Sequence, residues 1–371
     1  MLTWVEIDKK ALQKNISALR QTVGRGVELM PVIKANAYGH GFLEIARLCA
    51  RNKQADRLCV VELDEAIALI QNKIIKKPIL ILDILDLDVK KISVAAKHNV
   101  AFPVFTLKQA EMLNQAGERA NRQIKVHIKI DTGTARVGVL PQEIVDFVKK
   151  IKQFRRLTIE GIWSHFSSSE SNSSVTKKQW RCFNEVNTKL RQTGIAAPFR
   201  HMACSAAAIL YPEMRADGVR AGLTVYGLYP ARILKKKISL LPVLSWRTKI
   251  IQMKILPKNT PIGYGGSYVT KRLTRLATIP VGYADGYDRR FGDNASVLVR
   301  GARCPIRGRV CMNLAMVDVT GVKDAKAGDT VTLIGRQGRA EITADELAKQ
   351  AHTINYEIVT RIAHHIPRIT V

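Results

Sequence analysis

The sequence lacks any apolar stretch long enough to cross a membrane. A transmembrane helix needs roughly 20 consecutive apolar residues, and no run in the 371 residues approaches that length. The N-terminus also lacks the pattern of a secretory signal, because the charged residues Glu6, Asp8 and Lys9 follow the first apolar residues instead of preceding them. We therefore expect a soluble, untargeted protein of the cytoplasm.

Cysteines are few, and none is placed in a recognisable motif. The six cysteines show neither the close spacing of a zinc site nor a dense disulfide framework. Reduced thiols are the expectation for such a protein. We predict no metal centre.

Acidic residues are scarce relative to basic ones. The chain has 31 Asp and Glu against 59 Lys and Arg, which gives a formal net charge of +28. Such an excess requires nucleic acid to be considered as a partner. However, the basic residues occur in short scattered groups such as Lys76-Lys77 and Lys235–Lys237, without the interleaved aromatics that single-strand binding favours. The pattern indicates a basic solvated surface, and salt-sensitive binding would identify the nucleic-acid alternative.

Strand-like and helical segments alternate over the first 220 residues. Helical periodicity separates eight short apolar or β-rich runs, at 27–33, 58–61, 79–82, 100–104, 124–130, 157–163, 199–203 and 218–219. This alternation is typical of a (β/α)8 TIM-like barrel, whose active site lies at the carboxyl ends of the strands.

The pattern changes after residue 233. Strand-like runs with short turns follow at 244–256, 273–280, 296–299, 304–310, 315–319 and 330–334. We therefore expect an opening strand in residues 1–9 that joins a β domain, a barrel over 10–233, and a mostly β C-terminal domain over 234–371.

One lysine comes directly after the first strand of the predicted barrel. Lys34 follows the apolar run 27–33, and the turn residues Asn36, Gly39 and Gly41 come after it. Partial burial favours a neutral amine, which can condense with an aldehyde to form a Schiff base. Spacing alone leaves open a lysine whose stem packs on the barrel rim.

The residues around this lysine carry a family resemblance. The string Val32-Ile-Lys34-Ala-Asn-Ala-Tyr38-Gly-His-Gly41 resembles the pyridoxal-phosphate lysine motif of the alanine racemase family. The resemblance covers nearly the whole chain. It implies a pyridoxal 5'-phosphate enzyme of fold type III, an isomerase that interconverts L- and D-alanine and supplies D-alanine for peptidoglycan. Lys34 would bind the cofactor, with Tyr38 beside it.

The resemblance assigns further roles at the strand ends. Arg136 would contact the cofactor and the substrate carboxylate, and Lys129 would be carbamylated, as an anion that orients Arg136. His165 would lie beside the cofactor ring, and Arg220 would donate to the pyridine nitrogen. An always-protonated arginine there leaves the ring a weaker electron sink, which favours reprotonation at Cα over transamination.

The cofactor phosphate has its own set of residues. Barrel phosphate sites form after the seventh and eighth strands, which matches the positions of Ser205, Gly222 and Leu223. The resemblance adds Tyr356 as a contact of the phosphate.

A racemase also needs an acid/base on the opposite face of the substrate. The segment 261–268 resembles the part of the family that carries a catalytic tyrosine, which here is Tyr264. A tyrosine has a pKa of about 10, so a relay through His165 and Arg220 would help it to lose its proton. Tyr283 and Tyr356 would narrow the passage for substrate, and Met312 would contribute backbone near the substrate carboxylate.

The family resemblance also implies a homodimer with shared active sites, in which Tyr264 acts on the Lys34 of the neighbouring subunit. Three positions depart from the usual family residues: Thr134, Cys204 and Asn313. They leave open a broad-specificity amino-acid racemase. A fold-type III decarboxylase is the next alternative, which racemisation without loss of mass would exclude. A non-catalytic pyridoxal-phosphate carrier would lack the β domain.

Overall fold

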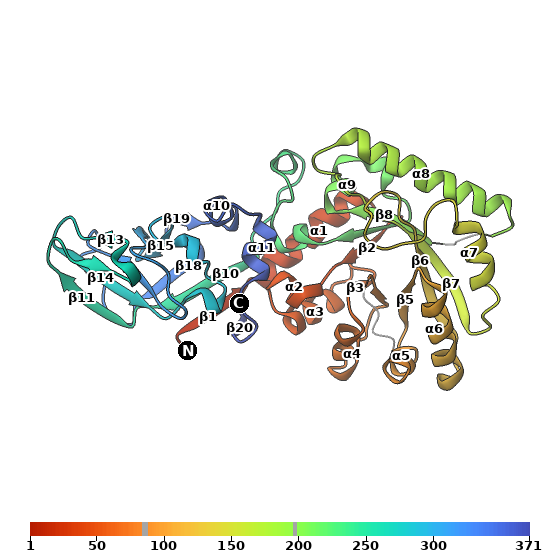
Figure 1. The fold of residues 1–371 in the computed structure, drawn as a ribbon, viewed down its shortest axis with the longest axis horizontal. Coiled ribbons are helices and arrows are strands. Elements are labelled where there is room, and N and C mark those ends of the chain that lie inside the picture. Colours follow the sequence, from red (N-terminus) through yellow and green to blue (C-terminus); the bar gives the residue numbers. More distant parts are fainter. Residues whose placement is uncertain (84–87, 196–198) are drawn as a thin grey trace. The chain divides into compact units, whose positions relative to one another are not determined.

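The computed structural model describes residues 1–83, 88–195 and 199–371. These residues form two compact units. The sheet unit comprises Met1–Ala11, Ala35–Glu44 and Pro242–Val371, and the barrel unit comprises Leu12–Lys34 and Ile45–Leu241 (Figure 1). The sequence placed the divisions at residues 10 and 234. It gave no indication that the segment after Lys34 packs with the sheet unit.

The barrel unit is built on one sheet of eight parallel strands in the order β2-β9-β8-β7-β6-β5-β4-β3. The two end strands meet through a parallel bridge between Val32 and Cys59. The predicted (β/α)8 architecture is therefore confirmed. The strands are β2 (Glu28–Pro31), β3 (Leu58–Val60), β4 (Ile79–Ile81), β5 (Val100–Val104), β6 (Ile124–Lys129), β7 (Leu157–Trp163), β8 (Phe199–Cys204) and β9 (Gly218–Ala221).

Strands β3, β4 and β5 are hydrophobic on both faces because both faces are covered. Every residue of β3, β4 and β5 is buried. Figure 1 shows α4, α5 and α6 lying beside these strands. Thr106 is the N-cap of α6, and its hydroxyl accepts from Gln109 N–H at 3.2 Å in a capping box. The helices are α1 (Lys9–Val23), α2 (Lys34–Tyr38), α3 (Phe42–Arg51), α4 (Leu63–Gln71), α5 (Val89–Ala95), α6 (Leu107–Ala120), α7 (Ile144–Ile151), α8 (Ser173–Gln192) and α9 (Ser205–Leu210).

The sheet unit is mostly β. In its largest sheet β1 (Thr3–Ile7) runs antiparallel to β10 (Leu244–Lys249) and parallel to β20 (Arg368–Thr370), so the two ends of the chain share one sheet. The other strands of this sheet are β15 (Ser296–Val299), β16 (Ala302–Pro305), β18 (Thr330–Gln337) and β19 (Ala340–Ile342).

Smaller elements complete the sheet unit. A second sheet joins β11 (Gln252–Leu256), β14 (Thr274–Ile279) and β17 (Ala315–Asp318), and a hairpin joins β12 (Pro261–Ile262) and β13 (Tyr268–Val269). Two short helices, α10 (Ala344–Gln350) and α11 (Asn355–Thr360), lie near the end of the chain.

Two strand predictions in this unit are wrong in detail. The run 244–256 is not one strand, because it divides into β10 and β11, which belong to different sheets. The run 304–310 is not a strand over its length. Strand β16 ends at Pro305, and Gly308 has a φ of 72° with its Cα facing the Ile262 carbonyl, so an added Cβ would lie 2.7 Å from that oxygen. A left-handed backbone cannot continue a β ladder.

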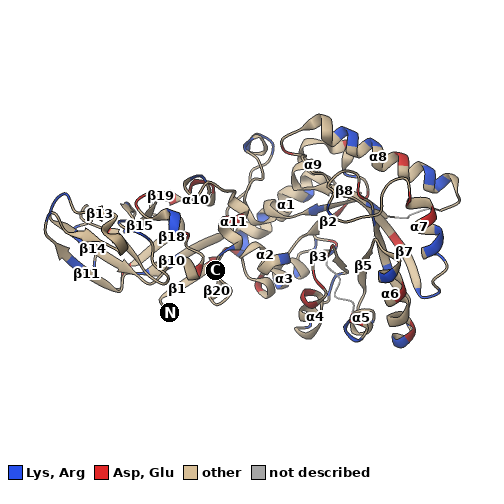
Figure 2. Cartoon of the chain, viewed as in Figure 1, with Lys and Arg blue, Asp and Glu red and all other residues tan. Residues whose placement is uncertain are grey.

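Among the described residues, none of the helices combines the length and apolar character that crossing a membrane requires. Basic side chains lie on separate elements, as with Lys149 and Lys150 on α7 and Lys177 and Lys178 on α8 (Figure 2).

Candidate functional site

Lys34 lies beyond the carboxyl end of the first barrel strand, as the sequence predicts, three residues after the last residue of β2. The two residues before it, Val32 and Ile33, are buried. The next four residues, Ala35 to Tyr38, form a turn with φ values between 52° and 54°. L-residues in this left-handed region cost roughly 1 to 2 kcal/mol each. The chain therefore leaves the barrel unit after Lys34 through a strained segment that apolar periodicity does not indicate.

Contacts within the sheet unit hold this left-handed turn. Arg368 donates from Nη2 and Nε to the Gly39 carbonyl at 2.9 and 3.2 Å. The Asn36 side chain accepts from Phe42 N–H at 2.8 Å. Gly39 has a φ of 81°, and an added Cβ would lie 1.8 Å from the Val359 carbonyl oxygen. Only glycine fits between the turn and α11.

Arg220 is the central cation of the barrel unit. It lies on β9 and is 3% exposed. Its guanidinium donates to His201 Nδ1 at 2.5 Å, to His165 Nδ1 at 3.1 Å, and to the carbonyls of Ser164 and Met202. Burial lowers its pKa to about 10, so it stays protonated at pH 7. All four acceptors are neutral, and within the described ranges Arg220 forms no ion pair with a carboxylate.

His165 follows β7 and is neutral at pH 7. Burial holds its pKa well below the usual range, and four nearby cations act in the same direction: Arg220, Arg136, Lys129 and Lys34. Because Arg220 donates to Nδ1, the ring carries its proton on Nε2. Four of the predicted residues thus act electrostatically on one neutral imidazole.

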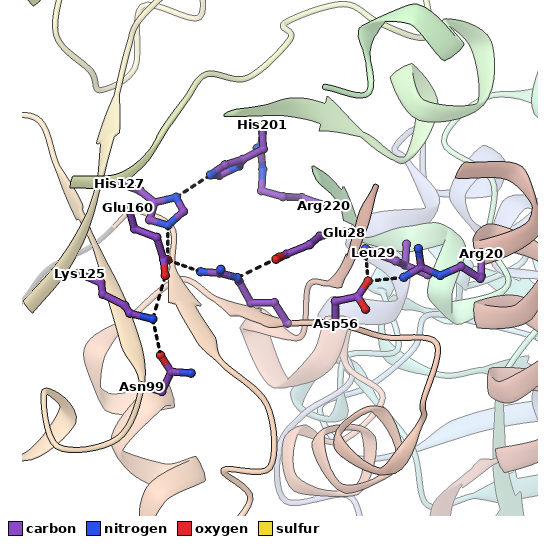
Figure 3. A network of polar contacts seen from close by, with 11 residues as sticks. Arg20, Glu28, Leu29, Asp56, Asn99, Lys125, His127, Glu160, His201 and Arg220 are labelled. Atoms are coloured by element: carbon purple, nitrogen blue, oxygen red, sulfur yellow. Dashed lines mark hydrogen bonds and ion pairs between the residues drawn. The ribbon is translucent and has the colours of Figure 1, made fainter. Parts of the chain in front are cut away.

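A chain of hydrogen bonds extends from Arg220 through the barrel (Figure 3). His201 Nε2 lies 2.9 Å from His127 Nδ1, and His127 Nε2 lies 2.8 Å from Glu160 Oε2. Glu160 also pairs with Arg57 at 2.7 Å and Lys125 at 3.0 Å. Burial alone would raise the pKa of Glu160, but hydrogen bonds, first from His127 and then from Arg57, outweigh it and hold the pKa well below the usual range. Glu160 is therefore an anion that can only accept.

Lys129 ends β6 and is 1% exposed. It forms an ion pair with Asp83, whose other oxygen lies 3.4 Å from Arg136 Nη2. Burial lowers the pKa of Lys129 to about 8, although the Asp83 carboxylate acts in the opposite direction. The centroid of the Trp163 ring lies 4.4 Å from Lys129 Nζ and 4.7 Å from Arg220 Cζ. A cation over an aromatic face is stabilised by the ring quadrupole.

A second polar cluster lies after β8 and β9. The buried Ser205 hydroxyl accepts from Gly222 N–H at 3.0 Å and lies 2.8 Å from Thr224 Oγ1. Leu223 begins a buried 3-10 turn immediately after Gly222. Cys204 Sγ lies 3.2 Å from Ser169 Oγ. The predicted Ser205, Gly222 and Leu223 are thus brought together.

The remaining predicted residues lie in the sheet unit. The rings of Tyr38 and Tyr356 are 6.2 Å apart. Tyr283 N–H donates to the Cys311 carbonyl at 3.0 Å, and Ala284 N–H donates to the Met312 carbonyl at 2.9 Å, so the segments of Tyr283 and Met312 are neighbours. Tyr264 is 71% exposed in a turn between β12 and β13.

A hollow of about 480 Å³ lies beside Tyr283, and Arg289 and Arg361 also line it.

Sequence reasoning missed five side chains of these networks. Asp83, Trp163 and His201 contact predicted residues, and His127 and Glu160 are linked to them through His201. Each lies in or directly after a barrel strand. A polar residue in a buried strand was the available signal for His127 and Glu160. No local pattern separates Asp83 from a turn residue.

Two family models match the chain. The model described as "Alanine racemase, N-terminal domain" matches residues 7–230, and that described as "Alanine racemase, C-terminal domain" matches residues 243–370. An alanine racemase of Halothermothrix orenii is 41% identical over 367 residues, which cover 99% of this chain and 96% of the relative.

Solved structures show the same similarity. The alanine racemase from Bacillus anthracis with bound L-Ala-P has a TM-score of 0.92 and 35% identity, with coverage of 100% of this chain and 95% of that one. A histidine racemase from Leuconostoc mesenteroides subsp. sake is also similar, with a TM-score of 0.90, 28% identity and coverage of 100% and 98%.

Proposed function

Because the chain belongs to the alanine racemase family, whose members are isomerases, we propose that it interconverts L- and D-alanine with pyridoxal 5'-phosphate as cofactor. The alanine specificity is inferred from the names of the relatives. The arrangement of the chain's own residues supports the cofactor.

The donor set of the barrel unit fits this cofactor. Arg220 is a buried cation whose acceptors are all neutral, which suits an unprotonated pyridine nitrogen, since a protonated one would be repelled. Ser205, Gly222 and Leu223 form a polar cluster that suits a phosphate. Lys34, at the end of β2, would hold the aldehyde carbon through Nζ. The neutral surroundings of Arg220 are the single observation that carries the proposal.

When bound, pyridoxal phosphate would withdraw electrons from the substrate Cα and so acidify its proton. The chain would do the rest. Lys34 Nζ would take up or return that proton on one face, and the Tyr264 hydroxyl would do so on the other. Arg136 would bind the substrate carboxylate. His165, neutral with its proton on Nε2, would be a hydrogen-bond donor towards the reacting groups.

We propose a homodimer in which each active site takes Tyr264 from the partner subunit. The exposure of Tyr264, at 71%, supports a role at a surface that meets another chain. Tyr283 and Met312 would stand beside the substrate in the same way, and Tyr38 and Tyr356 beside the cofactor. The six free cysteines fit the reducing cytoplasm, where D-alanine would supply peptidoglycan synthesis.

The test of the function combines chirality with cofactor absorbance. The parent enzyme should convert either alanine enantiomer to the racemate without loss of mass, and Lys34→Ala should lose both that activity and the absorbance band of the bound cofactor. Release of carbon dioxide would instead identify a decarboxylase. A panel of other amino acids, including histidine because of the similar histidine racemase, would measure the breadth of specificity.

Subunit mixing tests the shared site. Lys34→Ala and Tyr264→Phe homodimers should each be inactive or impaired. If the sites are shared, dissociation and reassociation of a mixture would form hybrid dimers with one complete site and would restore activity. No recovery in demonstrated hybrids would contradict the shared site while leaving the racemase assignment intact.

A further inference from the structure

Asp83 joins two cations of the barrel unit. It directly follows β4, Lys129 ends β6, and Arg136 lies in the loop after β6. These are all positions at the carboxyl ends of strands, which share one rim of a (β/α)8 barrel. One carboxylate oxygen of Asp83 forms an ion pair with Lys129 Nζ, and the other lies 3.4 Å from Arg136 Nη2. The Asp83 side chain is only 17% exposed.

The Asp83 carboxylate lies between two cations, Lys129 and Arg136. Arg136 and Arg220 both act to lower the pKa of Lys129, and Asp83 is the group that opposes them. Arg136 is 53% exposed, so water and side-chain entropy would leave its long side chain free to move. A carboxylate fixed on one side by Lys129 gives the guanidinium a preferred position.

We propose that Asp83 is the permanent anion that positions Arg136 for the substrate carboxylate, and that Lys129 consequently remains an unmodified amine. This inference rests on the proposed function for the role of Arg136. Asp83 acts through Arg136 and is a positioning residue. This proposal departs from the expectation that Lys129 is carbamylated, because it assigns the negative charge beside Arg136 to Asp83.

The ion pair also disfavours carbamylation chemically. In that reaction the neutral amine adds its lone pair to the carbon of CO2, an N–C bond forms, and the amine releases one proton to solvent. Asp83 stabilises the protonated amine, which has no free lone pair. The product would place a carbamate anion against the Asp83 carboxylate, where like charges repel. Each anion therefore excludes the other.

The test uses the holoenzyme and Asp83→Asn, which removes the charge and keeps the side-chain size. In the parent, ¹³C-labelled bicarbonate should give no protein-bound carbamate resonance and should not change the KM for alanine. In Asp83→Asn the KM should rise by roughly tenfold, equivalent to about 1.4 kcal/mol of binding, with a much smaller change in kcat. Bicarbonate should then lower the KM of this variant, because a more neutral Lys129 can accept CO2.

The control Asp64→Asn removes an exposed carboxylate that pairs with Lys91 on the same unit and should change none of these quantities. The carbamate resonance can be measured without catalysis. It therefore tests this inference independently of whether the protein is a racemase. A carbamate resonance in the parent that disappears in Lys129→Arg would overturn the inference, as would an unchanged KM in a folded Asp83→Asn. An enzyme with the predicted carbamate behaviour but no racemase activity would refute only the proposed function.

Discussion

Arg220 Nη1 donates to His201 Nδ1 at 2.5 Å, and this one contact orients a hydrogen-bonded chain that ends at Glu160. Since Arg220 can only donate, His201 must carry its proton on Nε2 and donate to His127 Nδ1 at 2.9 Å. His127 then donates from Nε2 to Glu160, which as an anion can only accept. Arg220 at one end can only donate and Glu160 at the other can only accept, so all the hydrogen bonds run in the same direction (Figure 3). The tautomers of His201 and His127 are therefore both determined.

Removing the acceptor at the end of this chain should disturb the histidines at a distance. Glu160→Gln replaces the carboxylate with an amide that both donates and accepts, so the tautomers of His127 and His201 are no longer fixed. We expect altered ¹⁵N shifts at both rings. We also expect about 3 kcal/mol of destabilisation, since Arg57 loses a buried partner. Histidine ¹⁵N spectra and urea unfolding measure the two effects.

Glu28→Gln is the matched control for that variant. Glu28 also pairs with Arg57, at 3.2 Å, and belongs to the same network without contacting either histidine. It should lower stability and leave the histidine spectra as in the parent. Identical spectra in Glu160→Gln and the parent would show that Glu160 does not set the tautomers.

Buried histidines should make the protein sensitive to mild acid. Burial lowers the pKa of His40 to about 4, against roughly 6.5 in an unfolded chain. The folded ring is neutral, so its contribution to stability is complete above pH 6.5. That contribution is lost as pH falls from 6.5 to about 4, because the unfolded state binds the proton first. The loss from His40 alone is about 3 kcal/mol.

The free energy of unfolding measured in urea between pH 7.5 and pH 4.5 tests this prediction. His40→Asn should be less stable at pH 7.5 but should lose less stability on acidification than the parent. His364→Gln changes an exposed histidine and should retain the parent's curve. An equal pH dependence in the parent and His40→Asn would exclude His40 as a source of it.

The left-handed turn after Lys34 should depend on Arg368. This guanidinium donates to carbonyls of Gly39, Ile362, Ala363 and Ile366, and a lysine cannot reach them together. Arg368→Lys should cost about 2 kcal/mol because buried carbonyls lose their donors. It should also speed amide exchange at residues 39–41. The exposed substitution Arg339→Lys should do neither, and unchanged exchange in Arg368→Lys would contradict the role of Arg368.

The barrel was predictable from the regular periodicity of its strands and helices. The left-handed turn after Lys34 was not, because it depends on an unusual backbone geometry. All eight strand runs contained enough buried apolar residues to be recognised, even the short β4. The turn 35–38 was missed because its φ values contradict the preferences of Ala35 and Ala37. The hydrogen bonds to Gly39, directly after the turn, come from Arg368, more than 300 positions away.

The candidate site likewise has residues that could be predicted from the sequence and residues that could not. Family resemblance indicated the residues that would meet the cofactor, such as Arg220 and Ser205. It did not indicate Asp83 or Glu160, because their roles follow from partners on other strands. Such contacts depend on the register between neighbouring barrel strands, which for example places Lys129 opposite Trp163. Local sequence patterns do not indicate that register.

The central claim is a two-base racemisation of alanine, with Lys34 and Tyr264 on opposite faces of the substrate. Its most direct test is proton NMR of each alanine enantiomer in D2O with Tyr264→Phe. The account predicts that this variant exchanges the Cα proton of one enantiomer only and inverts neither at a rate near that of the parent. Racemisation of both enantiomers at the parent rate would contradict it.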